Sequence, residues 1–452
     1  MKRRNYNLLI FLLLILIYLA GQFLIGTYHP EERRFVFDAP ADVDFLYYGA
    51  IVNTVFDAFP PWNPAFAGVK LTQPFVQYYP AAILAPLVNP YNAIRALNMM
   101  YLVLFGFLLR RLFPKRYGLP LLVLFAGSIF AADINAAGVD FIARGFTHTP
   151  FFLLLALAIF SRRLYLRLPS LVIAAFINGY LMLMVLPFLL TVYVFEKRKE
   201  SLLLLFAGLT GLLAASWFIS SEMTSHSIFS LFSKSLYFDP VEIFKHAAPF
   251  LILSIFFRQK QMLVLLIVAL LFGTFIHYNP FFPVFMAYFA GAMLLAAGEA
   301  RTPQSGLLAA GFAAILFAGF ISASYQKYNP ERKNYFPRYH TTTDASVEWI
   351  LRHTDDSDIF VSLTADEVDL GLIMQHRPVY LGYIGHLGHL GLDWKPRYEA
   401  TIRLFSSGLA PPDCDYIFYG PVERKYFPVA NLPFDTAYHD DIVTIFVIAA
   451  AD

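Results

Sequence analysis

The sequence predicts a polytopic α-helical membrane protein with a small α/β domain at its C-terminal end. Hydrophobic residues make up 58% of the 452 residues and charged residues only 15%, whereas a soluble protein carries about 25% charged residues. Apolar runs of membrane-spanning length recur from residues 7–26 to about residue 324. Beyond that point the chain is acidic and alternates between strand and helix patterns. We therefore expect a membrane domain over residues 1–324 and a separate α/β domain over residues 325–452.

About eleven transmembrane helices are expected, the first as an uncleaved helix rather than a signal peptide. One pair is ambiguous, because "RRLYLR" before it and "EKRKE" after it are both basic. Either this pair is a short hairpin that turns near Asn178 and Gly179, or the neighbouring segments are wrongly assigned. The expected segments are residues 7–26, 92–112, 119–134, 148–166, 169–181, 182–195, 202–220, 247–258, 261–276, 281–298 and 305–324.

The distribution of charge predicts the orientation of the chain. The segment ends on the side of the N-terminus carry 16 Lys and Arg residues against 7 on the opposite side, and basic loops stay in the cytoplasm. The N-terminus is therefore expected to be cytoplasmic, and eleven crossings place residues 325–452 outside. Of the 14 Asp and Glu residues before residue 325, 11 lie on the outer side. Negative charge has little influence on orientation, so this asymmetry indicates an outward-facing site that uses carboxylates.

The first outer loop, residues 27–91 (loop one), is longer than a connector requires, and long ordered loops are usually functional. Its segment "DVDFLYYGAIVNTVFDAF" (42–59) has helical spacing typical of a helix that lies in the membrane interface. The expected apolar face consists of Phe45, Tyr48, Val52, Val55 and Phe56. Asp42 would start this helix. In the simplest interpretation Asp42 is an N-cap and Asp44 favours the helix N-terminus, which leaves Asp38 unexplained.

Two further outer positions carry polar residues beside apolar helices. The second loop, residues 132–150, contains Asp133, Asp140, Arg144 and His148. Two carboxylates with a nearby Arg and His can bind a metal ion and a phosphate, or they can be ordinary interfacial polar residues. The pair His277 and Tyr278 follows an apolar helix, where it can point into a cavity or cap the helix in the headgroup region.

The C-terminal residues alternate between helix and strand patterns, which predicts a small α/β domain over a partly parallel sheet. The expected helices are 345–354, 365–375 and 395–408, and the expected strands are 358–363, 378–383, 414–420 and 442–449. His386 and His389 lie in a glycine-rich turn. They can ligate a metal, touch substrate as part of a loop, or belong to a purely structural turn.

These features resemble the GT-C superfamily, the polytopic glycosyltransferases that use lipid-phosphate-linked sugars. The resemblance rests on a first crossing followed by "DAPADVDFLYYGAIVNTV", then "PPWNP", a glycine and "YYP", a body of many helices, and an extracytoplasmic C-terminal domain. The elements "RPVYLGYIGHLGHLG", "CDYIFYGPVER" and "IVTIFVI" are similar to the tail of bacterial and archaeal membrane proteins in the same broad group.

The resemblance implies roles for the acidic residues. An Asp of the first outer loop acts as base on the acceptor or helps to hold a divalent metal, and here Asp42 or Asp44 takes this role. A second acidic position in the next outer loop corresponds to Asp133 or Asp140. The "DVD" segment is also similar to the metal motif of soluble glycosyltransferases that use nucleotide sugars, so dependence on Mg or Mn stays open. The expected metal ligands are Asp44, Asp133 and Asp140.

The resemblance also implies a cation that grips the lipid phosphate, which corresponds to Arg144 or Lys70. The other expected substrate-binding residues are His148, His277 and Tyr278. The donor's polyprenyl tail stays in the bilayer, so the site is expected at the membrane face.

The resulting functional hypothesis is a glycosyltransferase of the cell envelope. It would move a hexose or pentose from a polyprenyl-phosphate donor to a glycan, lipid or protein acceptor outside the cytoplasmic membrane, with no nucleic-acid partner. One alternative is a transporter or flippase of a lipid-linked saccharide. The sequence disfavours it, because the charged residues lie in loops rather than at mid-membrane and no inverted repeat is evident. The other alternative is a non-enzymatic envelope assembly protein whose outer domain binds a partner.

Overall fold

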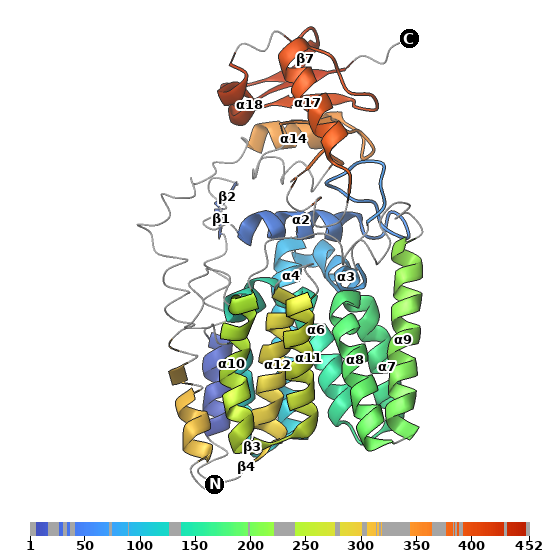
Figure 1. Cartoon of the computed structure of the whole chain (residues 1–452). Helices are drawn as coiled ribbons and strands as arrows, with labels where there is room; N and C mark the ends of the chain where they lie inside the picture. Colours follow the sequence, from blue (N-terminus) through green and yellow to red (C-terminus); the bar gives the residue numbers. More distant parts are fainter. Residues whose placement is uncertain are drawn as a thin grey trace. The chain divides into compact units, whose positions relative to one another are not determined.

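The chain folds into two compact units in the computed structural model (Figure 1). Unit 1 comprises Met1–Phe23 and Arg95–Arg332, and unit 2 comprises Leu24–Ile94 and Lys333–Asp452. Loop one therefore belongs to the same compact unit as the C-terminal residues. The structure describes residues 6–16, 27–29, 34–36, 41–71, 75–88, 90–125, 137–197, 199–220, 240–275, 281–300, 305–312, 314–315, 318, 344–363, 377–382, 384, 387, 392–428 and 432–448.

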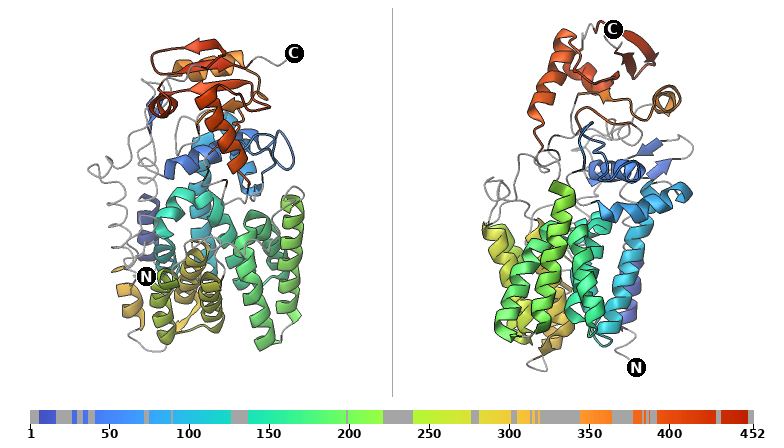
Figure 2. Two further views of the ribbon diagram at one scale, coloured as in Figure 1. Left: turned by 45° about the horizontal axis from the view of Figure 1, so that its top comes forward. Right: turned by 90° about the vertical axis from the view of Figure 1, so that its right-hand side faces the viewer.

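Unit 1 is a bundle of helices that run side by side (Figures 1 and 2). A helix is present within the described part of every segment expected to cross the membrane. Three stretches of the described chain are long and apolar enough to cross a membrane: Asn92–Leu112, Gly179–Glu196 and Lys199–Ser216. The total of eleven crossings stays a prediction. The helices are Tyr6–Leu16, α4 (Pro90–Leu112, which begins in unit 2), α5 (Gly118–Phe125), α6 (Ala137–Phe160), α7 (Leu164–Ile177), α8 (Gly179–Glu196), α9 (Lys199–Ser220), α10 (Pro240–Phe256), α11 (Lys260–Phe275), α12 (Phe281–Ala297) and residues 305–312.

The chain reverses at Asn178, so the ambiguous pair is a hairpin. Asn178 is extended, with φ −153° and ψ 93°, between the end of α7 and the start of α8. Helix α9 packs against both, with Gly211 beside Val172 of α7 and Gly208 beside Met182 of α8. If α7 and α8 formed one straight helix, Val172 and Met182 would be about 15 Å apart along its axis. Their partners Gly211 and Gly208 are only about 4.5 Å apart along α9, so α8 must fold back beside α7. The two basic ends of the pair therefore lie at the same end of the bundle.

Aromatic packing around α12 forms the centre of unit 1. The rings of Phe152 and Phe289 stack with centroids 5.1 Å apart, and Phe250 meets Tyr288 edge to face at 5.2 Å. Gly291 allows α10 and α12 to approach each other, because a Cβ at this position would lie 2.1 Å from the Phe250 ring. Phe250 is fully buried and cannot move aside without a change in the packing around it.

Unit 2 contains a four-stranded mixed sheet with helices, as the alternating pattern predicts. The strand order is β5–β6–β8–β7, in which β5 and β6 are parallel and the other pairs antiparallel. The expected strand at 378–383 is reduced to an isolated parallel bridge between Val379 and Phe360 of β5. Phe360 N donates to Pro378 O at 3.0 Å and Tyr380 N donates to Phe360 O at 2.8 Å, and the pairing does not extend into a full strand of the sheet. The expected helix at 365–375 lies outside the described residues. The elements are β5 (Phe360–Val361), β6 (Tyr416–Tyr419), β7 (Asp435–His439), β8 (Thr444–Val447), α14 (Asp344–His353), α17 (Lys395–Ser407) and α18 (Pro421–Tyr426).

The "GPVER" segment has a structural role in this sheet. The carboxylate of Glu423 is buried and accepts hydrogen bonds from Ser362 Oγ and Leu363 N, both at 2.7 Å, and from Gly420 N at 2.9 Å. Burial raises the pKa of Glu423 against the opposing effect of these donors. This side chain ties the start of α18 to the residues that follow β5.

Loop one contains regular elements rather than a continuous irregular segment. They are β1 (Thr27–His29) paired antiparallel with β2 (Arg34–Val36), α2 (Ala41–Thr54), the 3₁₀ turn η1 (Val76–Tyr78) and α3 (Tyr79–Val88). The expected helix at 42–59 is confirmed but ends at Thr54. Val55 and Phe56 therefore lie beyond the helix, and their assignment to its apolar face is wrong. Burial also extends beyond one face, which indicates that protein encloses this part of α2. Its buried residues are Tyr47, Tyr48, Gly49, Ala50, Ile51 and Val52, followed by Val55.

We expect Gly291→Ala to destabilise unit 1, because the added methyl group overlaps the buried Phe250 ring. Overpacking of this kind costs about 1–3 kcal/mol, and the melting temperature of the detergent-solubilised protein should fall by several degrees. Gly311→Ala is the matched control, since a Cβ at that helical position meets no atom within 4 Å. An unchanged melting temperature for Gly291→Ala would contradict the described packing of α10 on α12.

Candidate functional site

The two acidic residues predicted to act in catalysis lie in the first turn of α2. The helix begins at Ala41, so Asp42 and Asp44 are its second and fourth residues. The positive end of the helix dipole favours carboxylates at these positions. Their side chains lie outside the described part of the structure, as does Asp38.

Helix α2 is held in place by buried contacts with the irregular part of loop one. The hydroxyl of Tyr47 donates to Asn63 Oδ1 at 3.4 Å, and the same oxygen accepts from Ala65 N at 3.0 Å. Asn63 is 1% exposed. The ring of Tyr48 packs against Tyr78 at 5.9 Å. The helix that carries the two acids is therefore fixed against the residues that follow it.

Residues 61–71 form a narrow antiparallel ribbon, which we call the Trp62 ribbon. Asn63 N donates to Val69 O and Leu71 N donates to Pro61 O, both at 2.8 Å, and Trp62 and Lys70 are bridge partners. The Nζ atom of Lys70 lies 3.1 Å from the centroid of the Trp62 ring, a cation–π contact that stabilises its position. Trp62 is 44% exposed, so the predicted phosphate-binding cation lies on an accessible aromatic platform.

Backbone hydrogen bonds join the Trp62 ribbon to the C-terminal part of unit 2. Val379 N donates to Pro64 O at 3.1 Å, Ala67 N donates to Val379 O at 2.9 Å, and Gly382 N donates to Ala65 O at 2.7 Å. A Cβ at Gly382 would lie 2.7 Å from Ala65 Cβ, so only glycine permits this approach. The segment expected as a sheet strand is thus extended, but it pairs mainly with loop one.

Arg397 of α17 stabilises this contact between the Trp62 ribbon and the C-terminal residues, which we call the joint. Its guanidinium carbon lies 3.9 Å from the ring centroid of Phe66 and 4.7 Å from that of Tyr380. Nη1 donates to Tyr380 O at 2.6 Å and Nη2 donates to Ala67 O at 2.8 Å. Burial lowers the pKa of Arg397, opposed by the nearby Tyr380, but arginine remains protonated in proteins. The charged side chain of Arg397 therefore donates to a backbone carbonyl of loop one that has no partner among the described residues of the loop itself.

A salt bridge of the C-terminal residues lies near Asp57, which follows α2. Arg377, 5% exposed, donates to Asp356 Oδ1 at 2.6 Å, to Thr354 Oγ1 at 2.8 Å and to Thr354 O at 2.7 Å. The pKa of Asp57 is raised by partial burial and by the negative charge of Asp356. Loop one thus approaches the C-terminal residues here as well.

The single cysteine does not supply a nucleophile. Cys414 is buried, and this burial raises the pKa of its thiol to about 12. A thiol with that pKa stays protonated at neutral pH, and the thiol form is a poor nucleophile.

The predicted second loop is largely helical. Helix α6 begins at Ala137, so Asp140, Arg144 and His148 lie four residues apart along one helix in unit 1. Such residues are neighbours on a helix surface, although the side chains of Asp140 and Arg144 are not described. The ring of His148 is half-buried, 4.9 Å from Phe285 and 5.9 Å from Phe282. It therefore packs on the aromatic start of α12 rather than lying in a solvated loop.

Other predicted residues fall outside the described part of the chain, namely Asp133, His277, Tyr278, His386 and His389. Among the residues that are described, no group of three or more His, Cys, Asp or Glu side chains is placed to hold a metal ion. The expected metal site stays a prediction, and no chemical step is assigned to a metal below.

Loss of the Arg397 side chain should loosen loop one from the C-terminal part of unit 2. Hydrogen bonds from charged groups contribute about 1.5–3 kcal/mol each, so Arg397→Ala should open the Trp62 ribbon to limited proteolysis and lower the melting temperature. Arg403→Ala, an exposed arginine on the same helix, is the control. Equal proteolysis of the two variants would show that Arg397 does not hold the ribbon.

Comparison with known proteins identifies the fold. No protein-family model matches the chain, and no curated protein matches it. A solved structure of ArnT from Cupriavidus metallidurans bound to undecaprenyl phosphate matches with a TM-score of 0.57 at 10% identity, covering 98% of this chain and 98% of that chain. The apo state of the same protein matches with a TM-score of 0.53 at 11% identity, covering 99% and 98%. ArnT is a GT-C protein, so the predicted resemblance to the GT-C superfamily is confirmed at the level of the fold.

Proposed function

We propose that this chain is a membrane-embedded glycosyltransferase of the GT-C type, which transfers a sugar from a polyprenyl phosphate to an acceptor on the outer face of the membrane. One observation carries the proposal: the fold matches that of ArnT, solved with bound undecaprenyl phosphate, over 98% of both chains. The Lys70 cation over the partly exposed Trp62 ring supports an anionic ligand. The apolar helices of unit 1 support a membrane-embedded protein.

The reaction requires two kinds of protein group. An acceptor hydroxyl attacks the anomeric carbon, the bond from this carbon to the phosphate oxygen breaks, and polyprenyl phosphate leaves with the bonding electrons. The transition state has oxocarbenium character, and a carboxylate takes the hydroxyl proton. We assign the base to Asp42 or Asp44. We assign stabilisation of the leaving phosphate to Lys70 and Arg144, with His148, His277 and Tyr278 as further substrate contacts.

The described contacts of loop one support this assignment. Asn63 of the Trp62 ribbon binds Tyr47 of α2, so the ribbon that carries Lys70 is fixed to the helix that carries the acids. Catalytic groups held by a rigid frame need little reorganisation in the transition state. The joint with Arg397 adds further rigidity to the same frame.

Asp42→Asn and Asp44→Asn should identify the base. Loss of general base catalysis costs about 10²–10⁴-fold in rate, so one of the two variants should lose turnover with its melting temperature unchanged. The measurement is the release of polyprenyl phosphate from a panel of polyprenyl-phosphate hexoses and pentoses by the purified protein. Asp57→Asn is the control, because it removes a carboxylate from the residues that follow the C-terminal end of α2. Full turnover in both test variants would remove these residues from the mechanism. Movement of the lipid-linked sugar across the bilayer with no sugar transfer would favour a flippase.

Lys70→Gln should weaken binding of undecaprenyl phosphate, because the substitution removes the charge but keeps a polar side chain on the ribbon. We expect a loss of about tenfold, in the range of one charge-assisted hydrogen bond. Lys70→Arg should retain most of the affinity, since it keeps the charge above the Trp62 ring. Titration of the protein in nanodiscs with a fluorescent polyprenyl phosphate measures both. Equal affinities for Lys70→Gln and the native protein would rule out this contact.

A further inference from the structure

A cavity of about 520 Å³ with both polar and apolar lining residues lies in unit 1, where α10 ends and α11 begins. Its polar lining consists of Ser254, Arg258, Gln259, Lys260 and Glu299. Ligand pockets in proteins have volumes of about 300–1,000 Å³. The cavity is therefore large enough for a small polar molecule or a lipid headgroup, and nothing in the proposed sugar transfer uses it.

A short pair of strands forms one wall of the cavity. Strand β3 (Phe257–Arg258) pairs antiparallel with β4 (Glu299–Ala300), and Arg258 is the register partner of Glu299. Phe257 is 4% exposed and packs on Gly298, where a Cβ would come within 2.9 Å of it. Arg116 donates to Gly298 O. The strand pair and these contacts fix the backbone from which the charged side chains project.

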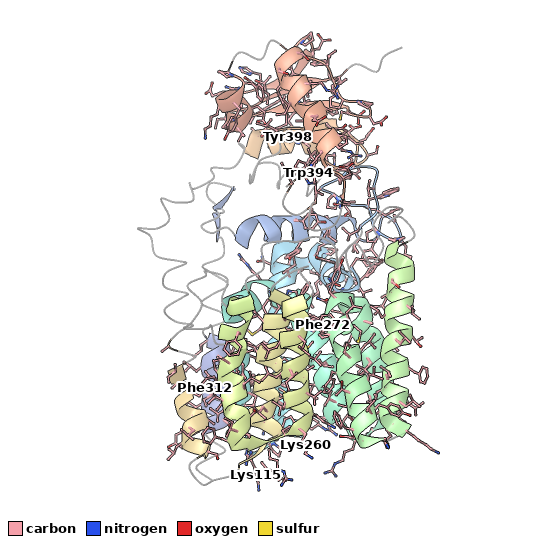
Figure 3. The ribbon with its side chains drawn as sticks, viewed as in Figure 1. Lys115, Lys260, Phe272, Phe312, Trp394 and Tyr398 are labelled. Atoms are coloured by element: carbon pink, nitrogen blue, oxygen red, sulfur yellow. The ribbon has the colours of Figure 1, made fainter. Side chains whose placement is uncertain are left out.

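The cavity lies at the basic end of the bundle, which charge distribution assigns to the cytoplasm. Figure 3 shows Lys260 at the end of the bundle where Lys115 also lies. Gln261, next to Lys260, donates to Glu196 at the end of α8 at 2.7 Å. In the predicted topology the cavity opens at the level of the lipid headgroups on the cytoplasmic side.

Exposed apolar side chains follow along both helices that meet at the cavity. Ile252 and Ile255 of α10 flank Ser254 within one turn and are 58% and 60% exposed. On α11, Ile267 and Leu271 are 43% and 51% exposed. A ligand with a charged head and apolar chains can contact both the charged lining of the cavity and these apolar side chains, whereas a free anion can contact only the charged lining.

The charged residues of the cavity lining favour an anionic head group. Arg258 and Lys260 contribute two positive charges and Glu299 one negative charge, so the lining has a net charge of +1. A phosphodiester carries one negative charge, which this lining can neutralise. The lining attracts a free phosphate as well, so the exposed apolar side chains of α10 and α11 are what favour a lipid headgroup over a free anion. Basic pockets between membrane helices on the cytoplasmic side bind anionic lipid headgroups. We propose that this cavity binds the phosphodiester of an anionic glycerophospholipid from the cytoplasmic leaflet.

Native mass spectrometry of the full-length protein released from phosphatidylglycerol and phosphatidylcholine nanodiscs tests this proposal. The test variant is Arg258→Gln with Lys260→Gln. The matched control is Arg110→Gln with Arg111→Gln, which removes two positive charges at the last turn of α4. We expect the test variant to retain phosphatidylglycerol about tenfold less than the native protein and the control less than twofold differently, with no change for phosphatidylcholine.

Two results would overturn the proposal. Equal losses in both variants would mean that only the overall positive charge of this end attracts the lipid. Displacement of phosphatidylglycerol by millimolar inorganic phosphate would identify a free-anion site instead. None of these readouts depends on sugar transfer, so the lipid site and the proposed enzymatic activity can fail separately.

Discussion

The arrangement of unit 2 depends on the joint between the Trp62 ribbon and the C-terminal residues, closed by Arg397. Loop one contains nine proline residues, and such a segment cannot satisfy its own backbone polar groups. The missing partners come from Val379, Gly382 and Arg397, and the bond from Arg397 to Ala67 joins residues 330 apart in sequence. The entropy lost on ordering the loop is offset by contacts that exist only once the C-terminal domain has folded.

This joint gives the C-terminal domain a role in the proposed chemistry without placing any of its residues in contact with substrate. It holds the ribbon that carries Lys70, and through Asn63 and Tyr47 the ribbon holds α2. Transfer from a lipid phosphate depends mainly on groups that are already oriented when charge develops. A long loop held by residues far away in the sequence is one way to keep an acid and a cation in such an arrangement.

The helices of unit 1 could be predicted because apolar runs of spanning length are strong signals, and most expected boundaries agree with the structure within a few residues. The hairpin at Asn178 could not be decided, because both of its ends are basic and only the packing of α9 on both helices settles it. Residues 137–147 were expected in a loop because Asp140 and Arg144 interrupt the apolar run, although both continue α6.

The joint itself was not predictable from local pattern, because its partners are hundreds of residues apart. One signal was present: Gly382 interrupts an apparent strand, and glycine within a strand pattern often marks a close approach of another backbone. The sequence correctly predicts that the two acids lie in the first turn of a helix, since Asp and an apolar run are a reliable N-terminal signal. The interpretation of Asp42 as the N-cap is wrong, because α2 begins one residue earlier at Ala41. Whether the two acids meet a substrate is a property of side chains that sequence pattern does not specify.

An electron cryomicroscopy map of the protein in nanodiscs with bound undecaprenyl phosphate tests the central claim most directly. The account predicts phosphate density beside Lys70 and within reach of the first turn of α2, with the polyprenyl chain running into the bilayer. Phosphate density elsewhere, with the Trp62 ribbon and the start of α2 facing no ligand, would contradict the assignment of a lipid-phosphate glycosyltransferase site to loop one.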